Sequence, residues 1–89
     1  MLFRSTVRRW AVQIGAYASH TLAEAQLAAY SRAVDVFGQA QRLVIPLALR
    51  NGRTLYRARF GLFAENEARE ICRQMTSRGE TCLAALQTN

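Results

Sequence analysis

The segment QRLVIPLALRNGRTLYRARF (residues 41–60) decides the fold, because a turn signal in it separates two apolar runs. The dipeptide Asn51-Gly52 is typical of a two-residue hairpin loop in which both residues have positive φ. Such a loop sets Leu47 opposite Tyr56 and turns the leucine and isoleucine side chains of the first strand toward the core. The other face of the hairpin is then expected to hold Val44, Pro46, Ala48, Leu55, Arg57 and Arg59.

Two similar strand–helix units flank this hairpin. WAVQIGAYA (residues 10–18) and YRARFGLFA (residues 56–64) both alternate in polarity and end in Gly-x-aromatic-Ala. Each is followed by a pattern typical of an amphipathic helix, over residues 21–33 and 65–78. A last short strand is expected over about residues 81–86.

The resulting order is βαββαβ, which predicts an α+β fold of the ferredoxin-like or RNP-like type. In that fold a four-stranded antiparallel sheet of order 4-1-3-2 carries both helices on one face. Pro46 agrees with this order, because a proline cannot donate a ladder hydrogen bond and should therefore lie on an edge strand.

The chain has 89 residues, enough for one small domain with one core. We expect that domain over residues 10–87, after a leader over residues 1–9 that is a linker with residues added for expression. The leader lacks the apolar stretch of a signal peptide, so an export signal would lie outside this sequence. No apolar run approaches the roughly 20 residues of a membrane span, so we expect no membrane insertion by this domain. We also expect the isolated domain to be monomeric.

The charge of the chain favours an anionic partner. The net charge is +6, and all 12 basic residues are arginines, whose planar guanidinium groups match carboxylates and phosphates. His20 is the single histidine, and no nucleophile or carboxylate accompanies it in a catalytic pattern. Because metal-ligand spacings and phosphate-binding glycine loops are also missing from the sequence, we expect no enzymatic activity, no cofactor and no metal.

The predicted sheet leaves one face uncovered by helices. Gln13, Arg57 and Arg59 should point out of that face, with Leu83 beside Gln13 on the neighbouring strand. An amide, two guanidinium groups and aliphatic surface could bind a sugar, or could form the solvated face that antiparallel sheets commonly have. The residues alone leave both interpretations open.

Two other functions fit the same strand order. RNA-recognition domains stack bases on outward-facing aromatic residues, whereas Phe60 is expected in the core here and the outward residues are arginines. We therefore expect no nucleic-acid partner. A ferredoxin-like protein-interaction domain without a glycan site is the other alternative.

A set of short motifs, taken together, resembles the SPOR domain family. The motifs are Trp10-x-Val12-Gln13-Ile14-Gly15-x-Tyr17, a helix with Ala25, Tyr56-Arg57-x-Arg59-x-Gly61-x-Phe63, and Glu67-Ala68. The resemblance implies a non-catalytic domain of the periplasm or cell envelope that binds peptidoglycan at the division septum and targets a larger cell-wall protein. It further implies a preference for glycan strands denuded of stem peptides. With its two cysteines, the chain looks most similar to the C-terminal SPOR domain of some alphaproteobacterial D-alanyl-D-alanine carboxypeptidases.

The resemblance also implies which residues contact the glycan. Leu55 stands where some members of the family stack an aromatic ring on the sugar, and Ala16 stands where many have serine. Arg59 could compensate, because peptide-free N-acetylmuramic acid exposes a lactyl carboxylate that a guanidinium can grip. By position, the contact surface of the family falls on Gln13, Ala16, Leu55, Arg57 and Leu83.

Cys72 and Cys82 are expected to form a disulfide. From Cys72 the helix rises for about six residues at 1.5 Å each before Gly79 reverses the chain. The strand then returns for about three residues at roughly 3.3 Å each, which brings the two cysteines level. An inward Cys82 would meet Cys72 on the apolar stripe of the helix, and Leu83 would then point outward. Two buried thiols are the alternative.

Overall fold

The computed structural model describes residues 7–87, so most of the expected leader, residues 1–6, lies outside the described residues. The expected order βαββαβ is confirmed, with a short 3-10 helix added after the first helix. The elements are β1 (Trp10–Tyr17), α1 (His20–Ala33), the 3-10 helix (Asp35–Phe37), β2 (Gln41–Ala48), β3 (Thr54–Phe63), α2 (Glu65–Ser77) and β4 (Leu83–Leu86).

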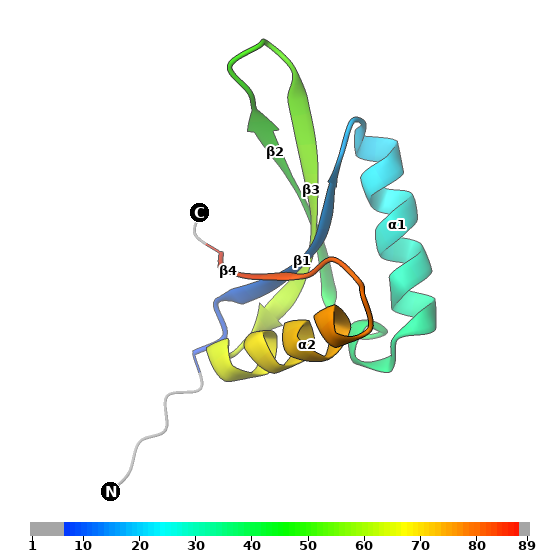
Figure 1. Ribbon diagram of the computed structural model, residues 1–89, viewed down its shortest axis with the longest axis vertical. Helices are drawn as coiled ribbons and strands as arrows, with labels where there is room; N and C mark the ends of the chain where they lie inside the picture. Colours follow the sequence, from blue (N-terminus) through cyan, green and yellow to red (C-terminus); the bar gives the residue numbers. More distant parts are fainter. Residues whose placement is uncertain (1–6, 88–89) are drawn as a thin grey trace, which may run out of the picture.

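The strands form one antiparallel sheet of order β2-β3-β1-β4, which is the expected order 4-1-3-2. Both helices pack on the same side of this sheet, α1 against β1 and β3 and α2 against β1 and β4 (Figure 1). We call the opposite side, which no described helix covers, the open face.

The hydrophobic core lies between the sheet and the helices. Phe37 and Phe60 stack at its centre with ring centroids 4.1 Å apart, and both side chains are fully buried. Val12, Leu27 and Met75 bring β1, α1 and α2 into the same cluster. Since burial of apolar surface contributes about 25 cal/mol per Å², these large side chains supply much of the stability of a domain this small.

The β2–β3 hairpin differs from the prediction by one residue. The Leu49 N–H donates to the Arg53 carbonyl at 2.8 Å, so the loop consists of residues 50–52 and not of two residues. Gly52 has a φ of 85°, whereas Asn51 does not have positive φ, which matches a type I turn followed by a glycine bulge. The Asn51 Oδ1 accepts from the Arg53 N–H at 2.9 Å and so stabilises this longer loop.

This shift exchanges the two faces of β2, because side chains alternate along a strand. The faces of β3 remain as expected. The residues that lie on the open face, and not in the core as predicted, are Leu43, Ile45 and Leu47, which pair with Arg59, Arg57 and Leu55. The residues that share the helix side instead are Val44, Pro46 and Ala48.

β2 is an edge strand, as Pro46 requires. Because the pair of Leu49 and Arg53 is hydrogen-bonded, the odd-numbered residues of β2 bond to β3 and the even-numbered ones direct their backbone groups away from the sheet. Pro46 therefore occupies a position whose missing donor costs the sheet no ladder bond.

β1 contains a bulge that brings two site residues to one face. Its register against β3 shifts between Gln13 and Gly15, so that Ile14 is an extra residue. Regular alternation would put Gln13 and Ala16 on opposite faces, since they are three residues apart. The bulge cancels this difference, and both residues lie opposite arginines of β3 on the open face.

Candidate functional site

The open face brings five of the expected site residues together in a row across three strands. Arg57 and Arg59 on β3 lie opposite Ala16 and Gln13 on β1. On the other side of β1, Gln13 pairs with Leu83 of β4. The expected contact surface is therefore continuous over the middle of the sheet.

Aliphatic side chains occupy the rest of this face. Leu55, the sixth expected residue, lies farther along β3 than the last pair with β1 and faces Leu47 across the hairpin. Leu43 and Ile45 extend the apolar surface along β2. Sequence reasoning missed these β2 residues because the two-residue loop placed them in the core. The three-residue loop, which Asn-Gly also permits, would have found them.

Arg59 is a buried residue on the open face. It is 8% exposed, with Nε donating to the Gln13 Oε1 at 2.9 Å and Nη1 donating to the Gln87 Oε1 at 2.8 Å. Both partners are neutral, and no carboxylate among residues 7–87 forms an ion pair with it. Burial, together with repulsion from Arg57, lowers the pKa of Arg59 from its usual value.

This environment prepares Arg59 to bind an anion. An arginine stays protonated at neutral pH even with a lowered pKa, so its positive charge is present but uncompensated. A buried charge is costly unless it is paired, and an arriving anion would recover part of that cost. Gln13 and Gln87 hold the guanidinium in place, which reduces the entropy lost when a ligand binds.

Arg57 is held more loosely than Arg59. Its Nε donates to the Ile45 carbonyl and its Nη2 to the Pro46 carbonyl, both at 3.4 Å. These bonds are long, so the guanidinium can leave them for a ligand at little cost. The open face thus presents one fixed and one adjustable cation on the same strand.

Acidic residues lie away from the open face. Residues 36–64, which include β2 and β3, contain five arginines and no aspartate or glutamate. The acidic side chains belong to the helices and the loop before β4, at Glu24, Asp35, Glu65, Glu67, Glu70 and Glu80. The net positive charge of the chain is therefore concentrated on the hairpin and the face it forms.

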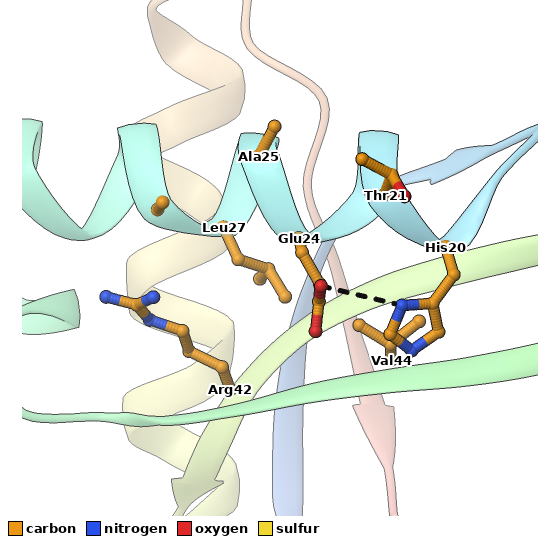
Figure 2. A pocket seen from close by; sticks show the side chains of 8 residues that line it. His20, Thr21, Glu24, Ala25, Leu27, Arg42 and Val44 are labelled. Carbon is orange, nitrogen blue, oxygen red and sulfur yellow. Dashed lines mark ion pairs between the residues drawn. The ribbon is translucent and has the colours of Figure 1, made fainter.

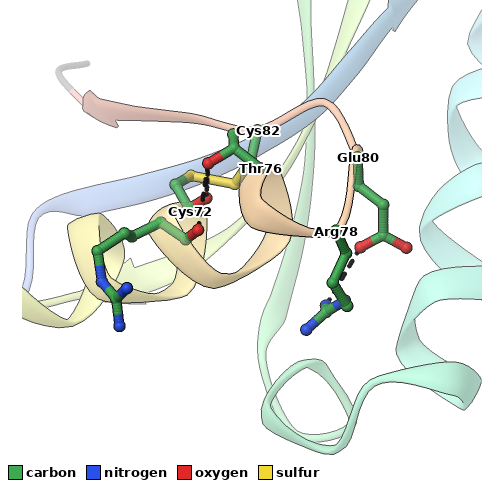
Figure 3. The surroundings of a disulfide bond; sticks show 6 residues. Cys72, Thr76, Arg78, Glu80 and Cys82 are labelled. Carbon is green, nitrogen blue, oxygen red and sulfur yellow. Dashed lines mark hydrogen bonds and ion pairs between the residues drawn. A yellow bond between two sulfur atoms is a disulfide. The ribbon is translucent and has the colours of Figure 1, made fainter.

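A disulfide fixes the strand at one edge of the site. Cys72 of α2 and Cys82 are bonded as expected, with Cα atoms 5.0 Å apart (Figure 3). Cys82 faces α2, so Leu83 points to the open face, where it is 55% exposed. Sequence reasoning missed Gln87, because the strand was expected to end at residue 86. Continued alternation from Leu83 places Gln87 on the same face.

A hollow lies on the helix side, between α1 and β2 (Figure 2). It has a volume of about 630 Å³ and is lined by His20 and Glu24 on the helix and by Arg42 and Val44 on the strand, among others. Three of its polar side chains have partners: His20 Nδ1 lies 3.6 Å from Glu24 Oε1, and Arg42 Nη2 donates to Ser31 Oγ. None of the expected site residues lines this hollow.

Aromatic residues of the described chain pack in the core or against it. Phe60, which a nucleic-acid platform would need on the surface, stacks on Phe37 inside the domain. Trp10 packs against the core and lies under the guanidinium of Arg69, 4.9 Å from its ring centre. Within residues 7–87 the open face therefore lacks the stacking surface on which RNA-recognition domains depend.

A solved structure shares this fold. It is the solution structure of the peptidoglycan binding domain of the cell wall lytic enzyme CwlC of B. subtilis, with a TM-score of 0.57 and 22% sequence identity. The alignment covers 99% of this chain and 100% of that domain. At this identity the likeness shows a common fold. No curated protein matches the sequence with significance.

The family model of the SPOR domain matches residues 6–84, which is nearly the whole chain. This match confirms the family that the residue pattern of β1 and β3 indicated. It agrees with the sheet order, with both helices on one face and with the fold of the CwlC domain. The chain belongs to the SPOR domain family.

Proposed function

We propose that this chain is a non-catalytic domain that binds peptidoglycan through its open face. The observation that carries the proposal is the buried, preorganised Arg59 guanidinium, which has neutral partners and no acidic one among residues 7–87. Membership of the SPOR family and the shared fold of a domain described as peptidoglycan binding support the same function.

The proposed ligand is a glycan strand denuded of stem peptides. In intact peptidoglycan the lactyl group of N-acetylmuramic acid is joined to the stem peptide through an amide. Removal of the peptide leaves a free carboxylate, which an arginine binds more strongly than a neutral acceptor. Arg59 would therefore distinguish denuded from peptide-bearing strands by charge.

The neighbours of Arg59 would complete the contact. Because the Gln13 Oε1 accepts from Arg59, its amide nitrogen is left to donate to a sugar oxygen. Arg57 would reach a second acceptor, while Leu83 and Leu55 would cover the C–H surfaces of the sugar rings. Ala16, which has no polar group to offer, would let the strand approach closely.

The wider context of the domain is also a proposal. We propose that it acts in the periplasm or cell envelope and directs a larger cell-wall protein to the division septum. A D-alanyl-D-alanine carboxypeptidase is the proposed parent, on the resemblance described above. The isolated domain is proposed to be monomeric.

Sedimentation with purified sacculi tests the proposed ligand. The domain should bind amidase-treated sacculi more tightly than untreated ones, and conversion of the free carboxylates to amides should abolish the difference. Gln13→Ala and Arg57→Ala should each weaken binding by about 1–2 kcal/mol, as expected for the loss of a hydrogen bond that involves a charge. Arg32→Ala, which removes an exposed arginine of α1, is the matched control and should bind normally.

Two results would contradict the proposal. Equal binding to amidase-treated and untreated sacculi would exclude recognition of the free carboxylate. Normal binding by a folded Gln13→Ala, Arg57→Ala double variant would exclude the open face as the site.

A further inference from the structure

The β2–β3 hairpin extends beyond the rest of the domain (Figure 1). The last pair that joins β3 to β1 is Tyr56 with Tyr17, so residues 47–55 pair in the sheet only with one another. We call residues 47–53 the hairpin tip. A two-stranded ribbon of this kind is only marginally stable by itself in water.

The tip exposes aliphatic side chains that the core does not use. Leu47 is 38% exposed and Leu49 is partly exposed. Neither belongs to the hydrophobic core or to the residues packed against it. The hydrophobic core therefore does not account for two leucines near the end of a projecting hairpin.

Arginines adjoin these leucines. Arg50 and Arg53 lie in and directly after the loop, both are exposed, and neither has an ion pair within residues 7–87. Residues 36–64, which include both arginines, contain no aspartate or glutamate. A long arginine stem can lie along apolar surface while its head remains with phosphate groups and water.

We propose that the hairpin tip binds the surface of a bilayer that contains anionic phospholipids. Leu47 and Leu49 would enter the boundary between headgroups and acyl chains, and Arg50 and Arg53 would contact lipid phosphates. No helix among residues 7–87 could cross a membrane, and none is needed for this contact. The inference revises the expectation of no membrane insertion, which rested on the length of apolar runs and could not detect a projecting tip.

The shape and chemistry of the tip favour a bilayer over a second glycan contact. The projecting tip, with exposed arginines at its loop and leucines directly before it, can reach a flat surface without collision from the helices (Figure 1). Leucine side chains gain free energy when they leave water for hydrocarbon. The row of Gln13, Arg57 and Arg59 that is proposed for glycan lies farther down the sheet. The two surfaces can therefore be tested separately.

Co-sedimentation with lipid vesicles tests this inference. The wild-type domain should sediment with phosphatidylcholine vesicles that contain phosphatidylglycerol, and only weakly with pure phosphatidylcholine. The Leu47→Ser, Leu49→Ser pair and the Arg50→Gln, Arg53→Gln pair should each lower the affinity for the anionic vesicles by about tenfold or more. The arginine pair should leave binding to amidase-treated sacculi unchanged. Leu47 faces Leu55 of the proposed glycan surface, so the leucine pair is judged by vesicle binding alone.

Matched controls separate the tip from general hydrophobicity and net charge. Leu22→Ser with Val36→Ser removes two exposed aliphatic side chains, 51% and 45% exposed, from the helix side. Arg32→Gln with Arg78→Gln lowers the net charge as much as the tip arginine pair does. Both control pairs should bind the anionic vesicles like the wild type.

Failure of the wild-type domain to sediment with anionic vesicles at low salt would overturn the inference. An equal loss of vesicle affinity in a tip pair and in its matched control would also overturn it. So would tip variants that bind sacculi more weakly but bind vesicles like the wild type. If a tip pair fails to fold, Leu49→Trp in a Trp10→Phe background gives an independent readout. Its emission should shift to the blue on anionic vesicles, and an unchanged spectrum would count against insertion.

Discussion

Replacement of Arg59 by methionine should separate ligand binding from stability. Methionine keeps an unbranched side chain but removes the charge. The arginine gains two hydrogen bonds to Gln13 and Gln87, each worth about 1.5–3 kcal/mol for a charged donor. Against this, the charge of a residue that is 8% exposed and has no described counter-ion costs up to several kcal/mol to desolvate. Because these terms are similar, the free energy of unfolding should change by no more than about 1–2 kcal/mol.

Binding should respond much more strongly than stability. Loss of a charge-assisted contact to a carboxylate costs about 1.5–3 kcal/mol, which is roughly tenfold to a hundredfold in affinity. Urea unfolding, followed by the fluorescence of Trp10, and sedimentation with amidase-treated sacculi measure the two quantities. Arg32→Met on the exposed surface of α1 is the control and should change neither.

Two outcomes would refute the reasoning about Arg59. A loss of more than about 3 kcal/mol in the free energy of unfolding would make the residue part of the scaffold, because its hydrogen bonds would then outweigh its desolvation. A folded Arg59→Met variant that binds sacculi like the wild type would show that no anion is bound at this position.

Gly52→Ala should cost about 1–2 kcal/mol of unfolding free energy because residue 52 has a φ of 85°, while Asn51→Ala should cost less than about 1 kcal/mol. Equal losses would indicate the two-residue loop. Mass spectrometry without reductant should find no free thiols in protein exported to a bacterial periplasm, and replacement of Cys72 and Cys82 by alanine should destabilise the domain by about 2–3 kcal/mol. Two free thiols would contradict the disulfide. Burial raises the pKa of Tyr17 above its ordinary 10.0, so its contribution to stability is complete below about pH 10 and is lost as the pH rises through the folded pKa. Tyr17→Phe should therefore resist alkaline unfolding better than the wild type, and an equal decline would argue against this role. Sacculus binding should weaken only modestly between roughly 50 and 200 mM salt, since few carboxylates are engaged, whereas a hundredfold loss would resemble nucleic-acid binding.

The topology could be predicted because independent local signals agreed. The repeated strand–helix pattern indicated the order of elements. Pro46 required that its own strand lie at an edge of the sheet, and only some strand orders meet this condition. Gly79, with a φ of 83°, ends α2 as a glycine after a helix commonly does. Each signal depends on backbone chemistry within a few residues, which a sequence records directly.

The register of the hairpin could not be predicted, because both faces of β2 are apolar. Leu43, Ile45 and Leu47 fit a core as well as Val44 does, so the hydrophobic pattern does not select between two registers. The loop would have decided between them. Asn-Gly, however, suits a two-residue turn as well as a three-residue turn in which only the glycine has positive φ.

The candidate site could be predicted in part. Alternation along β3 placed Arg57 and Arg59 on the open face, and the cysteine at position 82 fixed Leu83 there. Alternation alone could not bring Ala16 to the side of Gln13, because the bulge that does so depends on pairing with β3. That placement came from the family resemblance.

The two edges of the sheet determine whether copies of the domain can pair through their edge strands when they lie close together. An unprotected edge strand can pair with the edge strand of another copy, and a high local concentration of the domain would favour such pairing. Here Pro46 interrupts the outward donors of β2. At the other edge β4 has only four residues and follows Cys82, which is bonded to Cys72 of α2. Neither of these two edges offers a long unbroken ladder, so neighbouring copies have little from which to template a continuous sheet from one molecule to the next.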